Sequence, residues 1–388
     1  MKGGPAVQLD LSLTPVTSGE FWTARQRAGN SLHEISYRAC FKPPLARYFI
    51  ERFSAPGDVV YDPFMGRGTT PLEAALVGRI PWGRDSNPLS KVLLSPRLLP
   101  PSFEEVENRL GEINFSGPET AETDDLLVFF HPETLRAILA LRHYLNEKAG
   151  CGTLDPIDAW IRMVAINRLT GHSPGFFSVY SMPPNQAVSV KSQRRINERR
   201  KQEPPVRDVP RLILRKTKAL LKDATPDIRA TLDGVNDGAR ITIGDARSAP
   251  ELSADSAELV LTSPPFLDVV DYATDNWLRC WFAGIDLDEI RFDQHRRVED
   301  WCTFMAESIG DTARILKPGG TLALEIGEVR AGTIRLEEHI APLGNDVGLK
   351  PVEILINDQS FTKTAHTWGV TNNTRGTNTN RVVVFRKT

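Results

Sequence analysis

Short apolar runs alternate with helix-like segments over most of the chain, a pattern that predicts an α/β sheet. The apolar runs predict strands at Val59–Tyr61, Ile80–Asp85, Ile241–Ile243, Leu259–Leu261, Thr321–Ile326, Val352–Ile356 and Arg381–Phe385. Helical patterns occur at Leu45–Ile50, Pro71–Leu76, Trp277–Phe282 and Trp301–Leu316. Residues 1 to about 30 show neither pattern, so we expect them to be irregular. Lys317–Gly320 predicts a turn into the strand that follows it.

The stretch from residue 101 to residue 237 breaks this alternation. Its apolar residues predict helices, including Asp155–Leu169, and its loop Gly171–Gln186 is rich in glycine, proline and aromatic residues. A structured insertion with such a loop more often serves recognition than packing. We expect a sheet domain of residues 1–100 and 238–388 with a mainly helical insertion at 101–237.

Charge is distributed unevenly along the 388 residues, whose net charge is −2. The stretch Lys191–Lys222 holds twelve Lys and Arg against three Asp and Glu, a local excess of +9 that leaves −11 for the rest. A basic stretch on an acidic protein is typical of a polyanion site. A solvated helix face is the commoner explanation of an isolated charge run.

No apolar run approaches the length of a membrane span, and Met1–Pro5 lacks a signal-peptide pattern, so we expect a cytoplasmic protein without a membrane partner. The four cysteines are scattered and show no zinc spacing. We therefore expect neither a structural metal nor disulfides.

The segment Asp62–Thr70 reads Asp-Pro-Phe-Met-Gly-Arg-Gly-Thr-Thr and lies between a predicted strand and a predicted helix. Gly66 and Gly68 allow a sharp turn and close approach of a ligand, and the helix start offers free N–H groups. Asp85 follows about twenty residues later, where an acid can accept hydrogen bonds from ribose hydroxyls. An ordinary tight turn and a helix-capping acid are the alternatives.

Several predicted strands end in polar groups, at Asp62, Asp85, Asp245, Ser263 and Glu325. In an open parallel sheet, ligands bind beyond these strand ends. Acids there suit a ligand with hydroxyls, an amine and an exocyclic amino group. The chain lacks a Walker lysine motif, which disfavours a nucleoside triphosphate.

The segment Ser263-Pro264-Pro265-Phe266 is the most specific feature. Its prolines fix the backbone and remove two N–H donors, which leaves their carbonyls and the serine oxygen to accept hydrogen bonds from a substrate amine. Phe266 offers a flat face for a planar base. The alternative is a proline-rich turn with Phe266 in the core.

These two motifs resemble those of the DNA amino-methyltransferases, which use S-adenosylmethionine to methylate cytosine N4 or adenine N6. The resemblance covers residues 33–100 and 240–330, and it implies a Rossmann-like class I methyltransferase sheet. It implies the catalytic residues Ser263, Pro264, Pro265 and Phe266. It implies cofactor contacts by Lys42, Asp62, Phe64, Gly66, Gly68, Thr69, Thr70, Asp85 and Asp245.

The resemblance also implies direct methyl transfer to a base flipped out of duplex DNA. Serine at position 263 favours cytosine N4, with adenine N6 as the alternative. We expect phosphate contacts from Arg194, Arg195, Arg199, Arg200 and Lys201, and Asn185 or Gln186 could read bases. A cognate restriction enzyme is a conceivable partner. An RNA or protein-glutamine methyltransferase and a catalytically silent nucleic-acid-binding protein are the remaining rivals.

Overall fold

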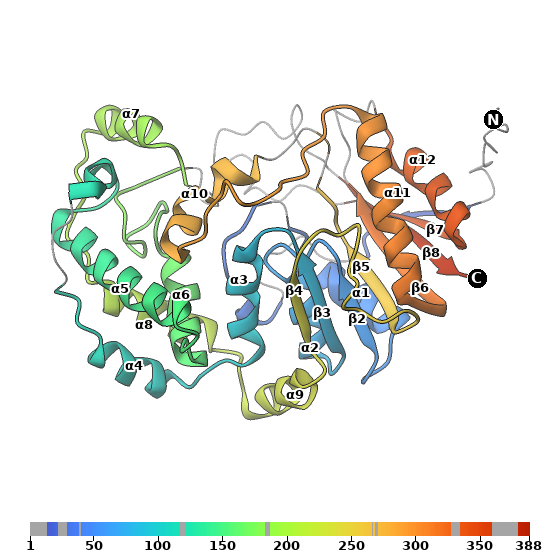
Figure 1. The fold of residues 1–388 in the computed structure, drawn as a ribbon, viewed down its shortest axis with the longest axis horizontal. Coiled ribbons are helices and arrows are strands. Elements are labelled where there is room, and N and C mark those ends of the chain that lie inside the picture. Colours follow the sequence, from blue (N-terminus) through green and yellow to red (C-terminus); the bar gives the residue numbers. More distant parts are fainter. Residues whose placement is uncertain are drawn as a thin grey trace.

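The computed structural model describes residues 14–21, 29–38, 40–116, 121–182, 187–265, 267, 271–326, 334–358 and 379–388. In these ranges, an eight-stranded sheet stands beside a group of helices (Figure 1). No helix in the described ranges is long and apolar enough to cross a membrane.

The sheet has the strand order β1-β7-β8-β6-β5-β2-β3-β4. The strands are β1 (Val16–Gly19), β2 (Val59–Asp62), β3 (Ile80–Asp85), β4 (Arg240–Ile243), β5 (Ala257–Thr262), β6 (Leu316–Ile326), β7 (Leu349–Asp358) and β8 (Thr379–Lys387). Among these described strands, only β8 runs antiparallel to its neighbours. The predicted Rossmann-like α/β sheet is confirmed.

The order of strands reverses between β2 and β5. From β2 the chain continues outward to β3 and β4, whereas β5 pairs on the other side of β2 and leads to β6. In a doubly wound sheet such a switch point leaves a crevice beyond the carboxyl ends of the two strands. Asp62 and Ser263 stand at these two ends.

Most of the helices begin at a proline or at a residue whose side chain caps the first turn. They are α1 (Pro43–Phe53), α2 (Thr69–Leu76), α3 (Pro88–Leu98), α4 (Phe103–Glu112), α5 (Pro132–Gly150), α6 (Pro156–Ile166), α7 (Val190–Arg200), α8 (Val209–Leu220), α9 (Pro226–Asn236), α10 (Tyr272–Ala283), α11 (Val298–Ile315) and α12 (Leu336–Ile340), with the 3-10 turns η2 (Ser31–His33), η3 (Ala121–Val128) and η4 (Ala341–Val347). Ser102 and Glu105 form a reciprocal capping box at α4. Asp155 caps α6 through the N–H of Asp158.

Neighbouring residues of each central strand serve opposite faces of the sheet. Val60 packs with Phe49 of α1, whereas Tyr61 belongs to the cluster of Trp301 and Phe304 on α11. The same alternation holds along β5, β6 and β8. The central strands therefore form a buried middle layer between α1 on one face and α11 on the other (Figure 1).

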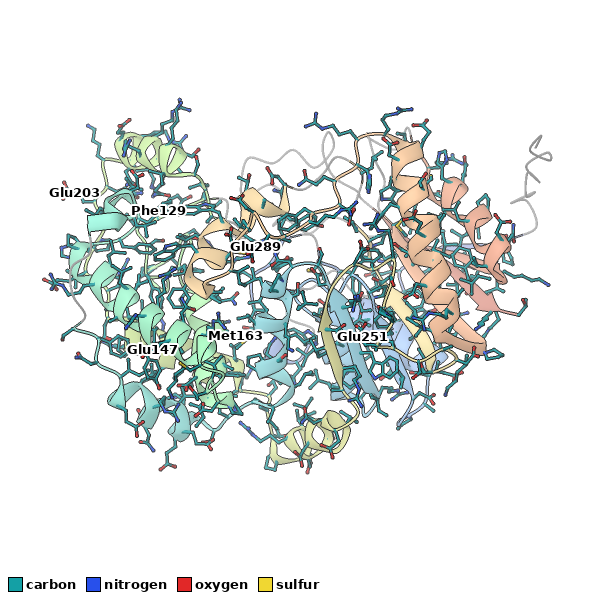
Figure 2. The ribbon with its side chains drawn as sticks, viewed as in Figure 1. Phe129, Glu147, Met163, Glu203, Glu251 and Glu289 are labelled. Atoms are coloured by element: carbon teal, nitrogen blue, oxygen red, sulfur yellow. The ribbon has the colours of Figure 1, made fainter. Side chains whose placement is uncertain are left out.

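The helical part and the sheet part share one continuous hydrophobic cluster. It contains Leu72 of α2 and Leu94 of α3, and it extends to Trp160 of α6. Phe129 and Met163 lie in the helical part and Glu251 lies against the sheet (Figure 2). Trp160 is fully buried, and its Nε1 donates to Thr217 Oγ1 at 3.1 Å. The domain boundaries at residues 100 and 238 stay a prediction.

Two expectations are wrong in detail. Val16–Gly19 is a strand because it pairs with Ile354–Asn357 at the edge of the sheet, although its own side chains are largely exposed and carry no apolar pattern. Lys317–Gly320 falls inside β6 as a bulge, since the register jumps from Leu316 to Thr321 opposite β5. Gly319, with φ +77°, makes that bulge possible.

Candidate functional site

A cavity opens at the carboxyl ends of the central strands. Its lining includes Asp62 and Phe64 after β2, Gly66 of the glycine turn, Asp85 at the end of β3, and Ser263 and Pro265 after β5. The cavity therefore lies at the switch point and joins the two sequence motifs that are about two hundred residues apart.

Asp62 is 2% exposed, and its carboxylate connects the glycine motif to the strand that precedes the proline motif. Its Oδ1 accepts hydrogen bonds from Thr262 Oγ1 at 2.5 Å and from the N–H of Phe64 at 3.0 Å. Burial raises the pKa of this carboxyl to about 7, and the hydrogen bonds only partly offset that rise. A cationic group entering the cavity would favour the ionised form.

The glycine turn depends on backbone conformations that side chains rarely adopt. Gly66 and Gly68 have φ of +51° and +77°. A Cβ on Gly68 would lie 2.7 Å from Leu94 Cδ1, so this glycine is needed for packing as well as for conformation. Gly68 does not line the cavity, and it acts by shaping the turn before α2.

Asp85 stabilises the glycine turn by accepting a main-chain hydrogen bond from it. Its Oδ2 accepts the N–H of Gly66 at 2.8 Å, and its Oδ1 accepts the N–H of Asn87 at 2.9 Å. Burial raises the pKa of Asp85, while these two hydrogen bonds oppose the rise. Asn87, and not Asp85, caps α3 through the N–H of Leu89. The capping interpretation of Asp85 is therefore wrong.

Ser263 donates a hydrogen bond from its Oγ to Glu325 Oε2 at 2.5 Å. Glu325 is 4% exposed and stands at the end of β6, the strand next to β5. The sequence marked Glu325 only as a polar strand end, because no local motif shows that it contacts Ser263. Trp301 Nε1 donates to the Pro265 carbonyl at 2.9 Å and so anchors the proline turn.

Four other predicted residues do not line the cavity. Thr70 Oγ1 donates to the Leu261 carbonyl at 3.1 Å, which ties α2 to β5. Pro264 is buried beneath the turn, and Lys42 stands at the start of α1, where desolvation lowers its pKa. Asp245 forms an ion pair with Arg247, whose Nε donates to both carboxylate oxygens. That contact holds the pKa of Asp245 below its usual value. Thr69, by contrast, lines the cavity, and its contact with the cofactor stays a prediction.

Phe266, Asn185 and Gln186 lie outside the described residues. The predicted phosphate-contacting residues are exposed on α7 and its end, namely Arg194, Arg195, Arg199, Arg200 and Lys201. The guanidinium of Arg200 lies 3.8 Å from the ring centroid of Tyr180, which connects α7 to the loop after α6.

A second cavity lies along α8 in the helical part. Arg207, Arg211, Arg215 and Lys218 contribute to its wall, with Asp208 as its acid. The Nε of Arg207 is buried without a hydrogen-bond partner. Together with α7, this wall accounts for most of the basic stretch seen in the sequence. Within the described ranges, no group of three or more His, Cys, Asp or Glu side chains is arranged to hold a metal ion.

Sequence comparisons connect the chain to DNA methylases. A family model of N6/N4 methyltransferases, described as DNA methylase, matches residues 13–88, which include the glycine turn and Asp85 but not Ser263. The type II methyltransferase M.BsoBI of Geobacillus stearothermophilus is 25% identical over 297 residues, or 70% of this chain and 56% of that protein. M.MjaII of Methanocaldococcus jannaschii is 36% identical over 62 residues, or 16% of this chain and 12% of that protein. The chain thus spans little more than half the length of the first relative.

Solved structures with similarity to this chain are also named as methyltransferases. A putative DNA modification methylase of Thermus thermophilus, complexed with S-adenosyl-L-methionine, has 22% identity and a TM-score of 0.24 over 37% of this chain and 53% of that chain. The rRNA methyltransferase AviRa of Streptomyces viridochromogenes has 12% identity and a TM-score of 0.35 over 92% of this chain and 90% of that chain.

Proposed function

We propose that this protein is a site-specific DNA methyltransferase that transfers a methyl group from S-adenosylmethionine to the exocyclic amine of a flipped base, with cytosine N4 favoured. One observation carries the proposal. The glycine turn and the Ser263 turn line the same cavity, and the hydrogen bond from Thr262 to Asp62 joins them. The sequence similarity to DNA methylases supports the same reaction class.

The cavity wall fits the cofactor by the chemistry of its donors and acceptors. S-adenosylmethionine would supply a methyl group on a positively charged sulfur. Asp62 and Asp85 offer carboxylate oxygens that suit an ammonium group and ribose hydroxyls, and Phe64 offers an apolar surface beside them. The turn at Gly66 lets the backbone come close to the ligand without a Cβ.

Ser263 and Glu325 would position the substrate amine. Because the Ser263 hydroxyl donates its hydrogen bond to Glu325, its oxygen lone pairs remain free to accept an N–H of the amine. The amine nitrogen would form a bond to the methyl carbon as the bond between that carbon and the sulfur of S-adenosylmethionine breaks, which would leave S-adenosylhomocysteine. The proton that the amine loses would pass through Ser263 to the buried carboxylate of Glu325. Holding the amine in line with the methyl group supplies much of the rate.

The substrate class follows from the charge of the helical part. The exposed Arg and Lys residues of α7 suit phosphates, which give affinity without sequence information. Serine in the first position of the proline motif favours cytosine N4, and adenine N6 is the alternative. Since the two curated relatives are named type II methyltransferases, a restriction enzyme of matching specificity is the proposed functional partner.

Transfer of a labelled methyl group tests the proposal. The full chain is incubated with S-adenosylmethionine labelled in its methyl group and with plasmid DNA, total RNA or a protein extract in separate reactions. We expect label in the DNA alone. Label confined to RNA or protein would overturn the DNA assignment, and no label in any pool, with no cofactor binding by calorimetry, would favour a catalytically silent protein.

A further inference from the structure

The cavity wall has an order set by the sheet. The strands that end at the cavity are adjacent in the order β5, β2, β3 and β4. Asp62 and Asp85 are the last residues of β2 and β3, and Ser263 and Ala246 follow β5 and β4. A long ligand that lies along these four strand ends has its reacting group near Ser263. Its middle then lies near Asp85, and its far end lies near Ala246, beyond β4.

At this far end, the acid expected from the sequence is not available to the cavity. Asp245 directs its carboxylate to Arg247 and does not line the cavity. Asp62 and Asp85 stand at the ends of β2 and β3, closer to Ser263 along the sheet, where the proposed function places the ammonium group and the ribose. The far end therefore needs an acceptor from another segment.

Asp293 is that acceptor. It belongs to the segment between α10 and α11, which carries Glu289 where the helical and sheet parts meet (Figure 2). Its side chain is 15% exposed and lines the cavity, and its Oδ1 lies 3.8 Å from Arg247 Nη2, too far for a hydrogen bond. Burial raises the pKa of Asp293, as expected for a carboxyl that has lost water without gaining a close partner.

Aromatic rings surround the same end of the cavity. Phe304 lies 5.8 Å from Phe64 between ring centroids, and both rings line the cavity with Phe292, a neighbour of Asp293 in the chain. His295, in the same segment as Asp293, has its ring centroid 5.1 Å from that of Phe304 in α11. Flat apolar faces beside one carboxylate suit a planar heterocycle that bears an amino group.

We propose that Asp293 accepts a hydrogen bond from the 6-amino group of the adenine of S-adenosylmethionine, in place of the Asp245 expected from the sequence. This assignment rests on the proposed function. It extends that function by giving the segment between α10 and α11 a part in cofactor recognition. Arg247 then has a structural role, since it holds Asp245 away and stands between the two acids.

Calorimetric titration of the full chain tests the assignment with two ligands, S-adenosylhomocysteine and S-inosylhomocysteine, which carries a 6-oxo group. The native protein should bind the 6-amino ligand about 10- to 100-fold more tightly, because the 6-oxo group cannot donate to a carboxylate. Asp293→Asn should remove or reverse this preference, since an amide can donate to the oxo group. Asp245→Asn and Asp288→Asn, which make the same change of charge, should retain it.

Each other outcome contradicts a defined statement. If the native protein binds neither ligand, the proposed function fails and this assignment fails with it. If the native protein prefers the 6-amino ligand and Asp293→Asn keeps that preference in full, the assignment to Asp293 alone is overturned. Loss of the preference in Asp245→Asn would return the role to Asp245.

Discussion

The hydroxyl of Thr262 lies 2.5 Å from the carboxylate of Asp62 and donates a hydrogen bond to it across 200 residues of sequence. The contact is possible because β2 and β5 are parallel neighbours and end at the same edge of the sheet. It places the glycine turn and the proline turn on one cavity. The site is therefore a consequence of strand order, and each motif alone would be an ordinary turn.

Asp62 makes stability depend on pH. Its pKa is about 7 in the folded protein because of burial, against an ordinary value of 3.8, so the folded state holds a proton that the unfolded chain has released. The stabilisation of the folded state by this bound proton is fully present below about pH 4 and is lost as the pH rises through 7. We expect the free energy of unfolding of the native protein, compared with Asp62→Asn, to fall between pH 4 and 7 in urea titrations. Parallel pH profiles for the two proteins would contradict the assignment.

Gly68 should be less tolerant of a side chain than Gly57. Both have positive φ, +77° and +87°, but only Gly68 has Leu94 within 3 Å of the added Cβ, and Gly57 has open space. Gly57→Ala should cost about 1 kcal/mol from backbone strain. Gly68→Ala should cost about 2–4 kcal/mol, since overpacking adds to the strain. Urea unfolding of the two variants measures both values, and equal losses would mean that Leu94 moves aside freely.

Glu325 and Ser263 should matter for the rate and not for cofactor affinity. Ser263→Ala removes the acceptor for the amine, and Glu325→Gln keeps a hydrogen-bond acceptor for Ser263 but loses the charge. We expect kcat to fall about 100-fold in each, the range for a lost proton-transfer group. Binding of S-adenosylhomocysteine should stay within about twofold. Ser253→Ala, at an exposed serine before β5, is the control and should change neither quantity. An increase in KM alone would assign the pair to substrate binding.

Charge reversal on α7 should weaken DNA binding at all sequences alike. Arg195→Glu with Arg199→Glu removes two exposed cations, so the slope of log Kd against log salt should shrink by about 2. The control is Lys350→Glu with Arg335→Glu, on β7 and before α12, which lie at the opposite end of the molecule from α7 (Figure 1). Fluorescence anisotropy with labelled duplex DNA gives both slopes. Identical slopes for the two double variants would exclude α7 from the DNA contact.

The sequence predicts what depends on neighbouring residues. The strands from Val59 and Ile80, and the glycine turn, follow from local apolar runs and glycines, and the structure confirms them. The contact of Glu325 with Ser263 could not be predicted, because it depends on β6 lying beside β5. The place of Asp293 in the cavity wall was not predicted either, since a loop between two helices carries no motif. The strand at Val16 owes its existence to pairing with β7 and not to its own pattern.

The residues predicted to contact the cofactor differ in whether they line the cavity. Asp62, Phe64, Gly66, Thr69 and Asp85 line the cavity, as strand ends and the turn between them predict. Asp245 also stands near a strand end, but Arg247, two residues later, takes its carboxylate. A competing contact of this kind depends on side-chain direction, which the spacing of acids along a sequence does not fix.

Nucleoside analysis by mass spectrometry tests the central claim most directly. Plasmid DNA is incubated with S-adenosylmethionine and either the native protein or Ser263→Ala, and is then digested to nucleosides. We predict N4-methylcytosine in the native sample and close to none with the variant. N6-methyladenine would overturn the choice of base but not the reaction. DNA without any methylated amine, from a native protein that binds the cofactor, would contradict the account.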